Sequence, residues 1–142
     1  MSSEVHGSEF KVQGAPLVRI DRFEDIEAWQ LARVLTQKVY RLTTAPRFSK
    51  DYALSRQIQA AAGSSMHNIA EGFDAESNAE FMRFLRYAKR SCTEVQSQLY
   101  VAIDEEYVSQ NQFDDVYEHA ARTPAAIHGF IKYLATYEKR SA

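Results

Sequence analysis

The feature that most constrains the fold is an apolar stripe that repeats every three or four residues over 77–106. The stripe consists of Phe81, Phe84, Leu85, Ala88, Cys92, Val95, Leu99, Ala102 and Ile103. This spacing places all of them on one side of an α-helix. Ser77 and Glu80 stand three residues apart directly before it, which is the capping-box pattern of a helix N-terminus. The range therefore predicts a helix of about 30 residues, roughly 45 Å long.

Three further ranges carry the same spacing, and helices are predicted over 22–43, 50–72 and 112–138. Pro46 is expected to stop the first of these. Gly72 is expected to end the second. In the last range, Pro124 either kinks the helix or divides it into two shorter ones.

Four amphipathic helices joined by short connections predict an all-α fold, an antiparallel up-down-up-down four-helix bundle. The 142 residues suit one domain, for which we expect residues 21–142. Residues 1–20 are expected to form a flexible N-terminal tail, because Gly7, Gly14 and Pro16 break any periodic pattern there.

Composition excludes several classes of protein. The single cysteine, Cys92, rules out a disulfide within the chain and a cysteine-rich metal site, and its place on the apolar stripe predicts a packed, inert thiol. No apolar run approaches the ~20 residues of a membrane span. Residues 1–14 lack the apolar core of a secretory signal. We expect a cytoplasmic, bacterial-type protein with no membrane partner.

Catalytic and metal-binding patterns are missing from the sequence. It has no Gly-rich phosphate loop and no Glu-x-x-His pair of the kind that bundles use for di-metal sites. His67 and Glu71 stand four apart, but one such pair falls short of a ligand set. His6, His119 and His128 are expected at the surface or its boundary. The predicted protein is not an enzyme and carries no cofactor and no metal.

Aromatic residues exceed what one apolar face per helix needs, with 8 Tyr, 8 Phe and 1 Trp. Those on the flanks of the stripes are Trp29, Tyr40, Tyr87, Tyr100 and Tyr107. Such a surplus indicates a second buried surface, and an interface between copies of the chain would supply it. The simpler alternative is that they all pack within the core.

Four basic residues, Arg83, Arg86, Lys89 and Arg90, fall on an outer face of the long helix. Such a row can contact nucleic-acid phosphates. The alternative is a solvated face, which the net charge of -2 and the pI of about 6.1 favour.

Polar residues interrupt the seam between the second and third predicted helices. Ser64, Asn68 and Glu71 could face Ser91 and Glu94. If buried, these groups must hydrogen-bond to one another, and such a network would set the register of the two helices. A ligand pocket built from the same groups is the alternative.

One stretch carries a family resemblance. Its residues are Gln57-Ile58, Ser64, Asn68-Ile69-Ala70-Glu71-Gly72, Ser77, Glu80-Phe81, Phe84-Leu85, Ala88, Ser91 and Glu94, with Phe23, Trp29-Gln30 and Tyr40 upstream. The sequence resembles the four-helix-bundle family of 23S rRNA intervening-sequence proteins, to which the accessory variability proteins of diversity-generating retroelements look related.

The resemblance implies an antiparallel four-helix bundle that assembles as a ring-like homopentamer without enzymatic activity. The retroelement relatives are basic and bind nucleic acid and a reverse transcriptase. Relatives commonly carry Arg where this chain has Gln59 and Ala60, and again after the Glu-Gly pair, where it has 74–76 (Asp-Ala-Glu). Arg90 stands in place of the usual Gly. A self-associating scaffold protein is therefore the first prediction, and a nucleic-acid-binding accessory protein is the alternative.

Overall fold

The computed structural model describes residues 8–11 and 17–141. Two short strands, β1 (Ser8–Lys11) and β2 (Leu17–Ile20), pair antiparallel, with Ser8 opposite Ile20. Of the flexible tail expected for 1–20, residues 1–7 and 12–16 lie outside the described part, and the rest forms these two strands, which are too short for a periodic pattern to reveal. Ile20 is buried with Ile26 and Trp29, so the packed domain begins before residue 21.

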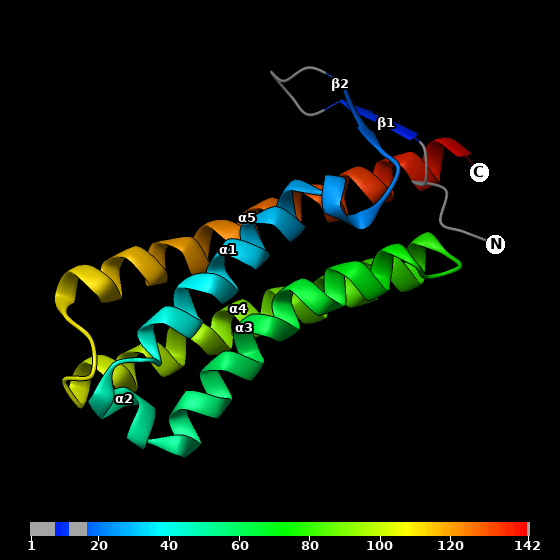
Figure 1. Cartoon of the computed structure of the whole chain (residues 1–142). Coiled ribbons are helices and arrows are strands. Elements are labelled where there is room, and N and C mark those ends of the chain that lie inside the picture. The colour runs from blue at the N-terminus through cyan, green and yellow to red at the C-terminus, as the bar shows by residue number, and fades with distance from the viewer. Residues whose placement is uncertain (1–7, 12–16, 142) are drawn as a thin grey trace.

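From residue 23 onward the chain is helical, which confirms the predicted class. A 3-10 turn, η1 (Phe23–Asp25), leads into α1 (Glu27–Leu42). The remaining helices are α2 (Pro46–Lys50), α3 (Tyr52–Phe73), α4 (Asn78–Asp104) and α5 (Gln110–Ser141). Figure 1 shows the long helices α1, α3, α4 and α5 side by side, with α2 in the turn between α1 and α3.

Local chemistry explains where the helices begin. The Ser77 hydroxyl accepts a hydrogen bond from the Glu80 amide (3.2 Å), as the capping-box pattern predicts. Asp51 caps α3 through the Leu54 amide (3.1 Å). Pro46 does not act merely as a stop, because it occupies the first turn of α2, where its missing N–H has no helical partner to lose.

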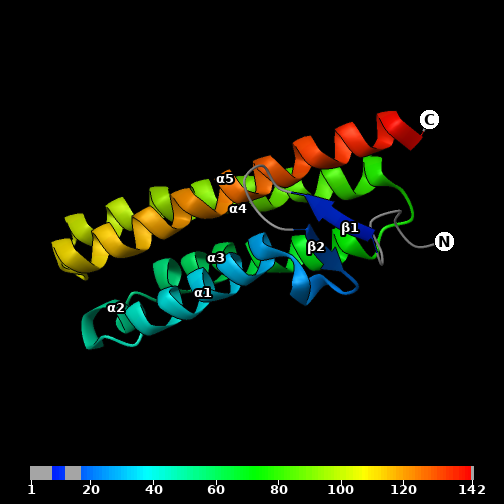
Figure 2. The ribbon, with the colours of Figure 1, turned by 90° about the horizontal axis from the view of Figure 1, so that it is seen from above.

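Each long helix packs against two others, because α1 and α4 each contact both α3 and α5. Helices α3 and α4 run in opposite directions, because Gly72 of α3 lies against Phe81 of α4 while Ser64 pairs with Ser91. Figure 2, seen from above, shows that the β1–β2 pair, the α3–α4 connection and the end of α5 share one end of the molecule.

The apolar core has two parts, one toward α2 and one toward the strands. Hydroxyl groups from three helices lie between them: Thr36 Oγ1 is 3.0 Å from the Ala62 carbonyl oxygen, and Ser65 Oγ donates to the same carbonyl (2.6 Å). On α5, Thr123 Oγ1 donates to the His119 carbonyl (2.9 Å). Every one of these hydroxyls therefore has a backbone partner within the core.

The structure excludes one of the two predictions for Pro124, and the ends of α3 and α4 differ from their predicted form. Pro124 lies inside α5 and does not divide it. Gly72 does not end α3, which continues to Phe73. At the end of α4, Glu106 adopts a left-handed φ of 60°, and the Tyr107 amide donates to the Ala102 carbonyl (2.8 Å). This is a Schellman ending with glutamate at the position that glycine usually occupies.

Candidate functional site

The polar seam between α3 and α4 is a chain of hydrogen bonds. Ser91 Oγ donates to Ser64 Oγ (2.9 Å), and Asn68 Nδ2 lies 2.9 Å from both the Ser64 hydroxyl and the Ser64 carbonyl oxygen. Ser91 is buried, while Ser64 and Asn68 are half-buried. The hydroxyl pair joins the two helices at one level, as a register-setting contact would.

The two carboxylates predicted for this seam take no part in the serine–asparagine chain. Glu71 and Glu94 are both exposed. Glu94 Oε2 accepts a hydrogen bond from Gln98 Nε2 (3.2 Å) on its own helix. The structure thus brings three of the five predicted residues into direct contact and leaves the carboxylates facing solvent.

The basic face extends beyond α4. Arg83, Arg86 and Arg90 are exposed, and Lys89 Nζ lies 3.5 Å from His128 Nδ1 of α5. Lys132 is exposed one helical turn beyond His128 on the same side of α5. His128, which is exposed as expected, and Lys132, which the sequence did not single out, therefore join the four predicted residues.

Intrachain contacts constrain this basic face only weakly. Arg83 lies 4.0 Å from Glu80, an exposed pair of little energetic weight. The Arg90 guanidinium lies over the Tyr87 ring, 5.6 Å from its centroid. The guanidinium groups are thus free to turn toward an anion.

The five flanking aromatic residues divide into two groups. Tyr40, Tyr87 and Tyr100 are exposed, at 51%, 40% and 52%. Trp29 is 9% exposed and packs edge-on against Phe23, and Tyr107 is half-buried. The first group leaves about half of each side chain open to another molecule, whereas Trp29 and Tyr107 pack mainly within the chain.

Tyr107 has a structural role within the chain. Its ring stacks on Phe48, and its hydroxyl donates to Asp51 Oδ2 (3.0 Å). The hydrogen bond to this carboxylate is the main reason that the pKa of Tyr107 is raised. Because Asp51 also caps α3, the contact ties the end of α4 to the start of α3.

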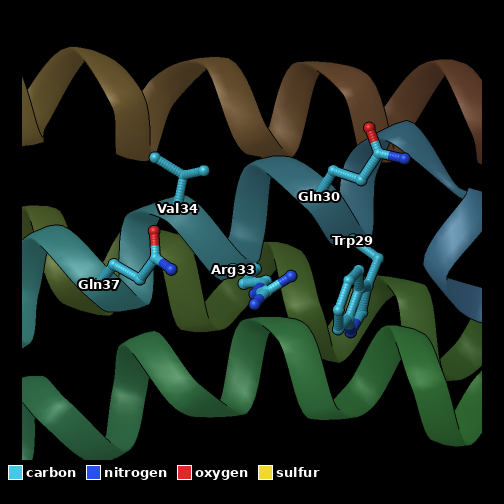
Figure 3. A pocket seen from close by; sticks show the side chains of 5 residues that line it. All are labelled: Trp29, Gln30, Arg33, Val34 and Gln37. Atoms are coloured by element: carbon cyan, nitrogen blue, oxygen red, sulfur yellow. The ribbon is translucent and has the colours of Figure 1, made fainter.

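The outward side of α1 carries an open hollow of about 300 Å³, lined by Trp29, Gln30, Arg33, Val34 and Gln37. Figure 3 shows these side chains along a single helix, with Trp29 toward α3 and Val34 toward α5. The Arg33 guanidinium lies over the Trp29 ring, 5.8 Å from its centroid. Tyr40 is exposed further along the same helix.

His119 is buried, at 3% exposure, and not at the surface or its boundary as expected. Its Nε2 lies 2.7 Å from the Leu31 carbonyl oxygen of α1, and the Arg122 guanidinium lies 2.9 Å from its Nδ1. A neutral ring donating from Nε2 and accepting at Nδ1 satisfies both contacts. Burial is the main reason that the pKa of His119 is lowered. No spacing rule in the sequence signals this contact.

The thiol of Cys92 is fully buried, and burial raises its pKa to about 12. It is therefore protonated and a poor nucleophile near neutral pH. Among residues 8–11 and 17–141, no group of three or more His, Cys, Asp or Glu side chains is placed to hold a metal ion. No helix in this described part of the chain is long and apolar enough to cross a membrane.

Comparison with known proteins identifies the family. The model of the 23S rRNA-intervening sequence proteins matches residues 24–129. This chain belongs to that family. The match begins in η1 and ends in α5, so it covers all four long helices in whole or in part. No match was found among curated proteins.

A solved structure shares the fold of this family member. It is a protein of unknown function of the S23 ribosomal protein family from Bacteroides thetaiotaomicron. The TM-score is 0.68 at 21% sequence identity, over 74% of this chain and 98% of the other. At this level of identity the similarity concerns the fold alone.

Proposed function

We propose that this chain is a non-enzymatic interaction protein, an antiparallel four-helix bundle that associates with copies of itself, five in number. The observation that carries the proposal is the pair of exposed tyrosines on opposite helices, Tyr40 on α1 and Tyr100 on α4. Exposed aromatic rings rimmed by polar residues are typical of protein interfaces. The family resemblance suggests the number of copies.

The chemistry of the interior supports a non-enzymatic role. The buried Cys92 thiol is protonated near neutral pH, and both ring nitrogens of His119 are engaged within the chain. Among the described residues, no histidine hydrogen-bonds to Ser64, Asn68 or Ser91, and the ring of the neighbouring His67 lies beside Gly63. A nucleophile paired with a base would be needed for covalent catalysis.

The test is the molar mass of the purified chain, measured by light scattering behind a sizing column at micromolar concentration. We expect a mass near five times 16.2 kDa. Tyr100→Ala and Tyr40→Ala should each lower the assembled fraction. Tyr52→Ala, an equally large truncation of a 67%-exposed ring, should not. A mass of one chain under these conditions would contradict the proposal.

A second candidate function is nucleic-acid binding on the α4–α5 basic face. It is favoured by the placement of His128 and Lys132 beside the four basic residues of α4. Binding of a fluorescent RNA or DNA duplex should weaken steeply as salt rises, because phosphate contacts release counterions. Arg86→Glu with Arg90→Glu should abolish it, while Lys50→Glu with Arg56→Glu, the same change of charge, should not. Absence of binding at low salt would remove this candidate.

A further inference from the structure

Two helices that carry exposed apolar side chains, α1 and α4, lie diagonally across the molecule. Each of α1 and α4 packs against α3 and α5. Their outward faces therefore point in opposite directions. Six large hydrophobic side chains are exposed in the part of the chain whose side chains are described, and four of them, Val34, Tyr40, Tyr100 and Val101, lie on these two faces.

The outward face of α1 is basic. We define it by Gln30, Arg33, Val34, Gln37, Tyr40 and Arg41, all of which are exposed; the exposed Glu27 lies one turn before Gln30, at the start of the helix. Lys38 is occupied by its ion pair with Asp115 of α5 (2.8 Å). The remaining cations, Arg33 and Arg41, are eight residues apart, about 12 Å along a helix.

The outward face of the second half of α4 is acidic. We define it by Glu94, Ser97, Tyr100, Val101 and Asp104, all exposed. Residues 91–104 contain no lysine or arginine, and Arg90, one turn before Glu94, marks the border with the basic face of the first half of α4. The two carboxylates are ten residues apart, about 15 Å along a helix, which is close to the separation of the α1 cations.

We infer that the basic face of α1 in one copy binds the acidic face of α4 in the next copy. The inference rests on the proposed self-association and assigns its two surfaces. Both faces combine exposed apolar side chains with charges of opposite sign, which is the complementarity that selects one partner and one register. Because the two faces differ, the contact is head-to-tail, and a constant rotation from copy to copy closes it into a ring of the proposed five.

The hollow on α1 fits one side chain of the acidic face. A cavity of about 150 Å³ holds a benzene ring, and the hollow beside Trp29 measures about 300 Å³. Tyr100 is 52% exposed; its ring makes edge-on contacts with Phe113 and Tyr117 of α5, and its hydroxyl lies toward the Tyr117 side chain. The uncovered side of the ring is available to another molecule. The Tyr100 ring of one copy enters the hollow of the next, where Arg33 lines the wall.

Charge reversal tests the assignment. Arg33→Glu with Arg41→Glu makes the α1 face acidic, and Glu94→Arg with Asp104→Arg makes the α4 face basic. Each double variant alone brings like charges together at every contact, so most of the protein should shift to 16.2 kDa in light scattering. Lys50→Glu with Arg56→Glu changes exposed charges outside both faces and should keep the wild-type mass.

Recovery experiments separate a broken contact from a misfolded variant. Mixing the two double variants in equal amounts pairs opposite charges at every contact, so assembled protein should return, with even numbers of copies favoured because the variants must alternate. The fourfold variant should assemble by itself. Circular dichroism should show unchanged helix content throughout.

The outcomes distinguish this inference from the proposed self-association. If the wild type assembles and the reversals leave its mass unchanged, or if neither the mixture nor the fourfold variant recovers, the assigned faces are wrong and self-association stands. If the wild type has the mass of one chain, both proposals are overturned.

Discussion

Two glycines of α3 allow the packing of this protein to be tested by the same substitution at two sites. A β-carbon added at Gly72 would lie 2.7 Å from Phe81 Cδ1 and 2.8 Å from Phe84 Cβ. Carbon atoms in normal contact are about 3.5–4.0 Å apart. Phe84 Cβ is fixed to the backbone of α4 and cannot turn away. At Gly63 the added carbon would meet only the His67 ring, at an ordinary 3.5 Å.

The magnitudes follow from two opposing effects. Replacing a helical glycine with alanine gains about 1 kcal/mol because the unfolded chain loses freedom. Overpacking a core costs about 1–3 kcal/mol, and the fixed neighbour at Gly72 places that site at the upper end. Gly63→Ala should therefore stabilise the chain by about 1 kcal/mol. Gly72→Ala should destabilise it by roughly 2 kcal/mol.

The assay is equilibrium unfolding in urea, followed by circular dichroism at one protein concentration, since association would shift the apparent stability. The two variants should differ by roughly 3 kcal/mol, or ~6 °C or more in Tm. Equal stabilisation by both substitutions would refute the reasoning, because it would mean that α3 and α4 are not held at the distance that Gly72 allows.

Three further predictions concern a helix end, a buried histidine and a cap. Glu106→Gly should raise the free energy of unfolding by about 1 kcal/mol by removing left-handed strain, whereas Glu105→Gly, at a φ of -85°, should not. Burial lowers the pKa of His119, so below about pH 6.5 the unfolded chain binds a proton at this residue and the folded chain does not. The free energy of unfolding should therefore fall as the pH drops from 6.5 to the pKa of the folded state. His119→Gln should reduce this pH dependence in urea titrations. Ser77→Ala should cost about 1 kcal/mol in the same assay by removing the N-cap of α4.

The helices were predictable because their signals are local. An apolar stripe with 3-4 spacing needs only neighbouring residues to be recognised, and the Ser77 cap was correctly placed for the same reason. Boundaries were less secure: the pattern of residues did not indicate α2, where five residues starting at Pro46 are too few to show a period. The paired strands before residue 21 were not predicted either, because each has only four residues.

The candidate site was predictable only in part. Ser64, Asn68 and Ser91 lie on the facing sides of their stripes, so their contact follows from the helical pattern and the antiparallel order. The helical pattern does not show which of the flanking aromatic residues remain exposed. Trp29 and Tyr100 both sit beside an apolar stripe, yet one is 9% and the other 52% exposed.

The sequence by itself determined the number, type and apolar faces of the long helices, because each depends on residues a few positions apart. Only the tertiary structure decided the rest. Gly72 is needed for the close approach of α3 and α4, His119 is buried because Leu31 of α1 lies opposite it, and the basic face gains His128 because α5 runs antiparallel beside α4. These properties depend on distances between helices, and a side chain's exposure is set by the neighbour that covers it.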